Sequence, residues 1–188
     1  MRRWPLFALL LACVLWGLQP CGSSAGQKEA GVEVASASDG PIKVMIALGG
    51  GLFGPVRSRF KVGEDIPVVI SVENTADQPA TYCLSTTVIQ NRPQLERDGK
   101  LLPYLTNLPE QVDNPAAIKR CEGSAFRQFY TLQPKQQKIV DWITFGQKGV
   151  LWYNSLSPGH YDLVLTRRLE CCQGPLVKSN KVVFDVVP

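Results

Sequence analysis

Cysteine is the residue type in this 188-residue chain whose chemistry depends most on its surroundings. Two cysteines lie in the first 25 residues and four lie beyond them: Cys13 and Cys21, then Cys83, Cys121, Cys171 and Cys172. In an oxidising compartment such residues form disulfides by default, whereas in a reducing one they bind metal or do redox chemistry. The compartment therefore decides how the four later cysteines are interpreted.

The N-terminus has the layout of a secretory signal peptide. Two arginines follow Met1, residues 6–18 form an apolar run, and the small residues from Ser23 to Ala25 suit cleavage after Ala25. The apolar run is too short to cross a bilayer comfortably as a helix, since a membrane span needs about 20 residues. An uncleaved N-terminal anchor is the less favoured alternative and the only membrane contact that we expect.

Cleavage there divides the chain into three parts. We expect residues 1–25 to be the signal peptide, residues 26–41 a flexible Gly-, Ala- and Ser-rich tether, and residues 42–188 one folded domain. The protein would then be secreted or periplasmic. The full chain carries 20 basic and 16 acidic side chains, and Arg2 and Arg3 leave with the signal peptide, so the mature net charge is +2. This near-neutral balance does not indicate nucleic-acid binding.

The four remaining cysteines allow three disulfide connectivities. We expect the strand through Cys83 to pair with the strand that begins near Tyr161 and ends at Cys171 and Cys172. Cys83 can then reach one member of this adjacent pair, and Cys121 takes the other. A vicinal Cys171–Cys172 disulfide, which would indicate a small thiol redox protein, and a metal site at the same cysteines are the alternatives.

No pattern of catalytic residues accompanies these cysteines. His160 is the single histidine, and Asp162, two residues further along the same strand, cannot complete a Ser-His-Asp triad with it. No nucleophile elbow, zinc-protease motif or phosphate-binding loop is present in the sequence. We expect a protein that is not an enzyme, with no catalytic residue, no metal site and no cofactor.

The pattern of apolar residues predicts an all-β fold. Apolar and polar residues alternate over several short segments separated by turn residues, and no segment shows a helical repeat, including the stretch from Tyr104 to Glu122. Asp98-Gly99 indicates a two-residue hairpin. The turn before Tyr161 is typical of an immunoglobulin-like sandwich, in which such a tyrosine bonds back to nearby backbone. We predict an immunoglobulin-like antiparallel β-sandwich of about eight or nine strands.

Charged and aromatic side chains suggest where its surfaces lie. Arg57, Arg59 and Lys61 form an outward row, and Arg167 and Arg168 add charge late in the Tyr161 strand. We expect such a row to protect a sheet edge from pairing, and binding of an acidic partner is the alternative. Three aromatic residues are expected to pack in the core or half-buried rather than to form a platform for glycan or peptide: Trp142, Trp152 and Tyr153.

Several turn motifs resemble a known family. The segment 60–79, which ends in Asn74-Thr-Ala-Asp-Gln-Pro79, looks like the first hairpin of many bacterial surface sandwiches. The later elements follow in the order of the bacterial intracellular proteinase inhibitor family: Leu95 to Lys100, Leu132-Gln-Pro134, Trp142 and Ser157-Pro-Gly-His-Tyr161. The resemblance implies an immunoglobulin-like fold. No inhibitory residue is carried over, and this chain differs by its cysteines and its expected export.

These observations indicate a non-catalytic exported interaction domain of the cell envelope. Its partner would be a protein or a cell-envelope component, with proteinase-inhibitor-like binding as one form. We expect binding through loops at the cysteine-bearing end, because strands fix the frame and loops carry recognition. The loop residues assigned to this role are Asn74, Asp77, Gln173, Lys178 and Asn180.

Overall fold

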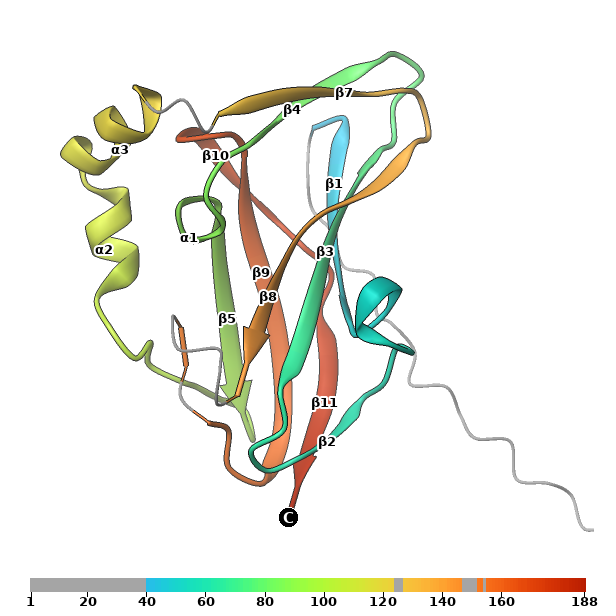
Figure 1. The fold of residues 1–188 in the computed structure, drawn as a ribbon, viewed down its shortest axis with the longest axis vertical. Coiled ribbons are helices and arrows are strands. Elements are labelled where there is room, and N and C mark those ends of the chain that lie inside the picture. Colours follow the sequence, from blue (N-terminus) through green and yellow to red (C-terminus); the bar gives the residue numbers. More distant parts are fainter. Residues whose placement is uncertain (1–39, 124–126, 147–151, 154) are drawn as a thin grey trace, which may run out of the picture.

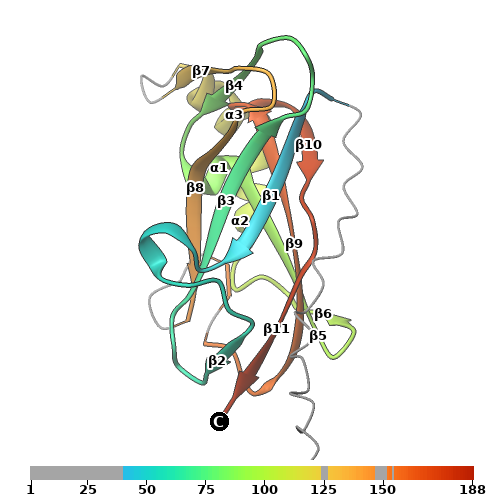
Figure 2. The same cartoon turned by 90° about the vertical axis from the view of Figure 1, so that its right-hand side faces the viewer.

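The computed structural model describes residues 40–123, 127–146, 152–153 and 155–188. The expected signal peptide and nearly all of the expected tether lie outside these residues. The described residues form an all-β sandwich of immunoglobulin-like type, in which two mainly antiparallel sheets face each other across one core (Figures 1 and 2). The first strand begins at Ile42.

Each layer has its own strand order. One layer has the order β1-β3-β8, with β1 at Ile42–Leu48, β3 at Ile66–Asn74 and β8 at Gln137–Phe145. The other has the order β2-β11-β9-β5-β6, with β10 paired to β9. Its strands are β2 (Arg59–Lys61), β5 (Asn91–Arg97), β6 (Lys100–Leu101), β9 (Gly159–Glu170), β10 (Gln173–Lys178) and β11 (Val182–Val187).

A separate two-stranded sheet, β4 (Ala80–Leu84) with β7 (Gln128–Leu132), crosses the upper end of the molecule in Figure 1. The described part of the chain thus holds eleven strands, more than the eight or nine expected. The additional ones are short, such as the two-residue β6.

The core fills the space between the two layers. Every second residue of β1 is buried, as its alternating sequence predicts. From the facing layers, Val44 and Ile70 pack into the same cluster as Leu95 and Leu163, and all four are fully buried. Burying an aliphatic side chain of this size contributes about 1.5–3 kcal/mol, so this alternation is the main source of stability.

The expectation of no helix is wrong for the segment between β4 and β7. It contains three short helices, namely α1 (Thr87–Gln90), α2 (Leu108–Asp113) and α3 (Pro115–Glu122), and a 3₁₀ turn lies at Gly51–Phe53. Each is too short to show a three-turn repeat. Local chemistry starts α3: Asn114 caps it by accepting a hydrogen bond from the Ala117 amide, and Pro115 occupies the first turn.

The expected partner of the Tyr161 strand is also wrong. β9 pairs with β5, in register from Asn91 opposite Arg167 to Arg97 opposite Tyr161, and not with the Cys83 strand. The single turn of α1 lets the chain leave β4, which pairs with β7, and enter the other layer as β5. β4 remains near β9 at the cysteine-bearing end without joining its ladder.

Two turns predicted from the sequence hold the lower end in Figure 1. Asp98 and Gly99 both have positive φ, 50° and 76°, as a type I′ hairpin turn requires. The buried Tyr161 donates a hydrogen bond from its hydroxyl to the Ser157 carbonyl at 2.7 Å, which pins the start of β9. His160 points to solvent on the opposite face of the strand.

We expect Tyr161→Phe to lower the free energy of unfolding by about 1 kcal/mol, because it removes one partly buried hydrogen bond and leaves the ring in place. Urea unfolding followed by fluorescence measures this. Tyr130→Phe is the matched control, since its hydroxyl bonds only to the exposed Gln128. Equal effects of the two substitutions would contradict a pinning role for Tyr161.

Candidate functional site

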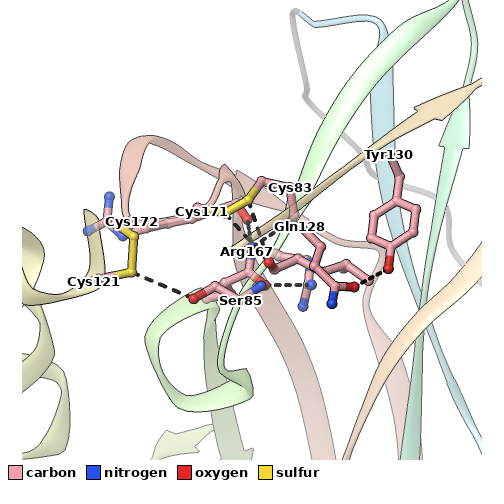
Figure 3. The surroundings of a disulfide bond; sticks show 11 residues. Cys83, Ser85, Cys121, Gln128, Tyr130, Arg167, Cys171 and Cys172 are labelled. Atoms are coloured by element: carbon pink, nitrogen blue, oxygen red, sulfur yellow. Dashed lines mark hydrogen bonds between the residues drawn. A yellow bond between two sulfur atoms is a disulfide. The ribbon is translucent and has the colours of Figure 1, made fainter. Parts of the chain in front are cut away.

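Two disulfides gather the upper end of the sandwich. Cys83 pairs with Cys171 and Cys121 pairs with Cys172, with Cα–Cα separations of 5.0 and 5.7 Å (Figure 3). This is one of the arrangements that the sequence analysis left open, and the vicinal bond is absent. All four cysteines are buried and form one cluster, against which Ile89 packs.

These bonds join three elements that the backbone ladders leave separate. Cys83 lies in β4, Cys121 in α3, and the adjacent pair in the turn between β9 and β10. That turn is tight, with Cys171 at a φ of 61°. Both crosslinks therefore end on one turn, and they hold β4 and α3 against it.

A groove of about 390 Å³ lies beside the disulfides. β4 and β7 form one wall, and the β9–β10 turn and the end of α3 form the other. Phe129, opposite Cys83 in the β4–β7 ladder, lines the groove with 66 % of its surface exposed. Leu169 and Tyr82 add further apolar lining, and four charged or polar side chains also border the groove: Glu122, Arg127, Glu170 and Gln173. An apolar anchor in a rim of polar groups is a common composition for a binding surface.

The structure buries Arg167, so its charge does not add to the surface row of Arg57, Arg59 and Lys61. Its guanidinium is fully buried beneath the disulfide end, where it donates to Asn91 Oδ1 at 2.7 Å and to Asp141 Oδ2 at 3.1 Å. Burial lowers the pKa of Arg167, and the neighbouring Asp141 carboxylate opposes that shift. A buried cation with an anionic partner from the facing sheet ties β9 to β8.

The side chain of Gln90 connects the buried Arg167 to the edge of β4. Its side-chain oxygen accepts from Arg167 at 3.1 Å and from the Ser85 amide at 2.7 Å. Its side-chain nitrogen donates to the Cys83 carbonyl at 2.9 Å. The amide of Gln90 thus takes the place that a neighbouring strand would have beside β4.

A second cationic cluster fixes α2. Arg92 is buried and donates to both carboxylate oxygens of Asp113, and Arg168 donates to the same carboxylate at 2.9 Å. Burial raises the pKa of Asp113, but the hydrogen bonds from the two arginines outweigh it and hold that pKa below its usual value. This ion pair keeps the helical segment beside the disulfide end.

The loop residues assigned to binding do not form one site. Asn74 is buried, and its side chain bonds to the backbone of Gln78, Leu132 and Gln133. Asn180 is also buried, and its amide bonds to both backbone polar groups of Ile46 in the middle of β1.

The three other assigned loop residues are exposed. Asp77 pairs with Lys135, Gln173 lies at the groove, and Lys178 ends β10. The two asparagines thus shape the frame, and only Gln173 reaches the groove.

A second exposed surface lies on the outer face of the β1-β3-β8 sheet. Trp142 is 56 % exposed, so the expectation that it packs in the core or half-buried is wrong, whereas Trp152 and Tyr153 are buried. Phe53 contacts Trp142, with ring centroids 5.8 Å apart. Trp142 alternates with the buried Ile143 along β8, and it therefore points outward.

The histidine lies far from the cysteines along β9. His160 Nδ1 is 2.8 Å from Asp185 Oδ1, at an exposed position near the strand start. Within residues 40–188, excluding the undescribed gaps, no three His, Cys, Asp or Glu side chains are placed to hold a metal ion.

Sequence reasoning missed the residues that build the groove and the support beneath it. Arg167 had a detectable signal, because it continues the inward-facing series Tyr161, Leu163 and Leu165. Phe129 had none, since an exposed phenylalanine in a strand has the same local pattern as a buried one. Gln90 had none either, because a long-range side-chain cap leaves no local pattern.

Comparisons with known proteins identify no family. No family model matches the chain, and no curated protein shows significant similarity. Among solved structures, the CARDB domain of a Pyrococcus furiosus protein is 10% identical with a TM-score of 0.34, over 77% of this chain and 91% of that domain.

Two enzymes are similar to the same degree. A β-glucosidase from Listeria innocua is 11% identical with a TM-score of 0.36, over 78% of this chain and 16% of the enzyme. A β-glucosidase from Erythrobacter marinus is 10% identical with a TM-score of 0.34, also over 78% of this chain and 16% of the enzyme. Likenesses at such TM-scores carry no argument, so the fold assignment rests on the strand order of the molecule itself.

We expect Arg167→Ala to lower the free energy of unfolding by about 3–5 kcal/mol, because it leaves the largely buried Asp141 carboxylate with no cation beside it. Arg59→Ala, which removes an exposed cation, is the matched control and should change stability by less than about 0.5 kcal/mol. Urea unfolding of both variants measures the difference. A loss below about 1 kcal/mol for Arg167→Ala would contradict the role given to this arginine.

Non-reducing peptide mapping should recover Cys83 joined to Cys171 and Cys121 joined to Cys172. Replacing Cys121 and Cys172 together by serine should cost about 2–5 kcal/mol, since the bond closes a long loop in the unfolded chain. Mapping that finds Cys83 joined to Cys121, or Cys171 joined to Cys172, would contradict the arrangement. A free-thiol count on the unreduced protein provides an independent check.

Proposed function

We propose that this chain is an exported, non-catalytic β-sandwich domain that binds a protein or cell-envelope component in the groove beside its disulfides. The observation that carries the proposal is the composition of that groove. It has an exposed phenylalanine, Phe129, in a polar and charged rim, and Cys83 and Cys172 of the two disulfides line it.

The disulfides support this assignment through their effect on the groove walls. Walls that are crosslinked before a partner arrives lose less conformational freedom on binding, which favours affinity. Both crosslinks end on the same turn, and the Cys121–Cys172 bond holds α3, which contributes Glu122 to the rim. A proteinase-inhibitor-like domain is a narrower form of this proposal, with a proteinase as the partner.

Export is supported by the cysteines and by the N-terminal sequence. Paired, buried cysteines suit an oxidising compartment. The Arg-rich start, apolar run and small residues before Gly26 are typical of a secretory signal peptide. Among the helices of the described residues, none is long and apolar enough to span a membrane.

The alternative of a thiol redox or metal-binding protein receives less support. Cys171 and Cys172 pair with two different partners, and all four cysteines of the described residues are buried. A redox or regulatory disulfide is typically accessible to an attacking thiolate. A metal-binding role would need free thiolates, which these bonds consume.

The test is a selection of ligands from a phage-displayed library of random seven-residue peptides on the oxidised mature protein. We expect selected peptides to bind at least tenfold more weakly to Phe129→Ala. Because Phe129 is mostly exposed, this substitution should leave stability nearly unchanged. Trp142→Ala is the matched control, since it removes another mostly exposed aromatic ring, from the other surface.

Fluorescence anisotropy of the labelled peptides measures the affinities. Peptides that bind equally well to Phe129→Ala, or that lose binding to Trp142→Ala instead, would contradict the groove as the site. A selection that yields no peptide would contradict it as well.

A further inference from the structure

The two edges of the β4–β7 sheet differ in how their backbone groups are satisfied. On the β4 side, the Cys83 carbonyl and the Ser85 amide both point to the side chain of Gln90, at 2.9 and 2.7 Å. They therefore point away from β7. In an antiparallel pair, residues whose backbone groups point away from the partner alternate with residues that bond to it.

This alternation fixes the orientation of β7. Cys83 lies opposite Phe129 and Thr81 lies opposite Thr131, so these are the non-hydrogen-bonded pairs of the ladder. The N–H and C=O groups of Phe129 and Thr131 consequently point outward, along the free edge of β7. Within the described residues β7 pairs with β4 alone.

Other strand edges of the described structure are closed or protected. Asn180 bonds to the outward groups of Ile46 in β1, and Gln90 does the same for β4. Register shifts interrupt the ladders of β8 and β10. Charged residues or a proline occupy the remaining edges: Arg59 and Lys61 in β2, Lys100 in β6 and Pro175 in β10. These are the devices by which natural sheets prevent pairing with another chain.

β7 has none of these devices. Its five residues, Gln128–Leu132, carry no charge and include no proline, and its ladder with β4 has no register shift. Its side chains Gln128, Phe129 and Thr131 are exposed. An open, uncharged, regular edge with exposed side chains is a template for an added strand.

We propose that the free edge of β7 receives an extended segment of a partner polypeptide as an additional β-strand, whose alternate side chains contact Phe129 in the groove. This inference rests on the proposed binding function and specifies its chemistry. Outward donors and acceptors at Phe129 and Thr131, two residues apart, match an extended backbone, and strand addition of this kind obtains affinity from the main chain and specificity from side-chain pockets.

The charges on and beside β7 indicate which residues the partner segment should contain. The stretch from Gln128 to Pro134 is uncharged, so the middle of the partner segment should be uncharged and rich in β-branched or aromatic residues. Arg127 is exposed directly before β7 and lines the groove. An acidic residue at the matching end of the segment would complement it.

Thr131→Pro tests the proposal on the oxidised mature protein. It removes an outward N–H, so the β4–β7 ladder should stay intact and the thermal midpoint should fall by only a few degrees. The probe is a seven-residue peptide selected from the displayed library. We expect Thr131→Pro to weaken its binding at least tenfold, whereas the matched control Thr131→Val, which keeps the N–H, should bind within twofold of the original.

Two further measurements do not depend on how well Thr131→Pro folds. Amide hydrogen exchange should show Phe129 and Thr131 exchanging fast in the free protein and slowly with the peptide bound, whereas Tyr130, which bonds to β4, should be slow in both. A peptide N-methylated at alternate amides should lose binding when the methyl groups face β7. An N-methylated series that binds equally well would overturn the proposal.

The outcomes separate the two levels of inference. In one outcome the peptide binds Phe129→Ala more weakly, binds Thr131→Pro with unchanged affinity, and leaves the Phe129 and Thr131 amides unprotected from exchange. Strand addition is then wrong, and binding in the groove stands. If the affinity of the peptide for Phe129→Ala is unchanged as well, the proposed function is wrong. A concentration-dependent dimer of the oxidised protein that Thr131→Pro dissociates would overturn the proposal by assigning the edge to a second copy of this chain.

Discussion

The buried guanidinium of Arg167 is the group on which the cysteine-bearing end of this sandwich depends. A cation removed from water costs several kcal/mol unless charge and hydrogen bonds compensate it. Asp141 from β8, Asn91 from β5 and Gln90 from α1 supply that compensation within 3.1 Å. The two sheets and the turn that links β4 to β5 are thereby held in one arrangement, more specifically than aliphatic packing alone would hold them.

The same requirement shapes the surface above. Gln90 meets Arg167 with its oxygen and also satisfies the edge of β4, so the polar core and the strand edge share one side chain. The disulfides of Cys83 and Cys121 then fix β4 and α3 to the β9–β10 turn. One connected set of contacts therefore buries the charge of Arg167, closes the edge of β4 and holds the groove walls together.

The amphipathic β-strands themselves were readable from the sequence. The alternation in β1, the Asp98-Gly99 turn and the Tyr161 corner each depend on a few consecutive residues, and the structure contains all three. The helices α2 and α3 were not readable, because one or two turns give no repeat and their position depends on Asp113 meeting Arg92 and Arg168. The strand that pairs with β9 was also predicted wrongly. The single turn of α1 leaves no repeat in the sequence, and it moves the chain from β4 to β5, which then pairs with β9.

The sequence by itself determined which faces of the strands are apolar, because the side-chain period of a strand is two. The same period is consistent with an inward Arg167 and an outward Trp142, although both were misplaced when judged by residue type. Only the tertiary structure decided which groups meet these side chains, which strand edge Gln90 closes and which edge is left to β7. Those choices depend on contacts between residues tens of positions apart, and backbone hydrogen-bonding groups are identical at every such position.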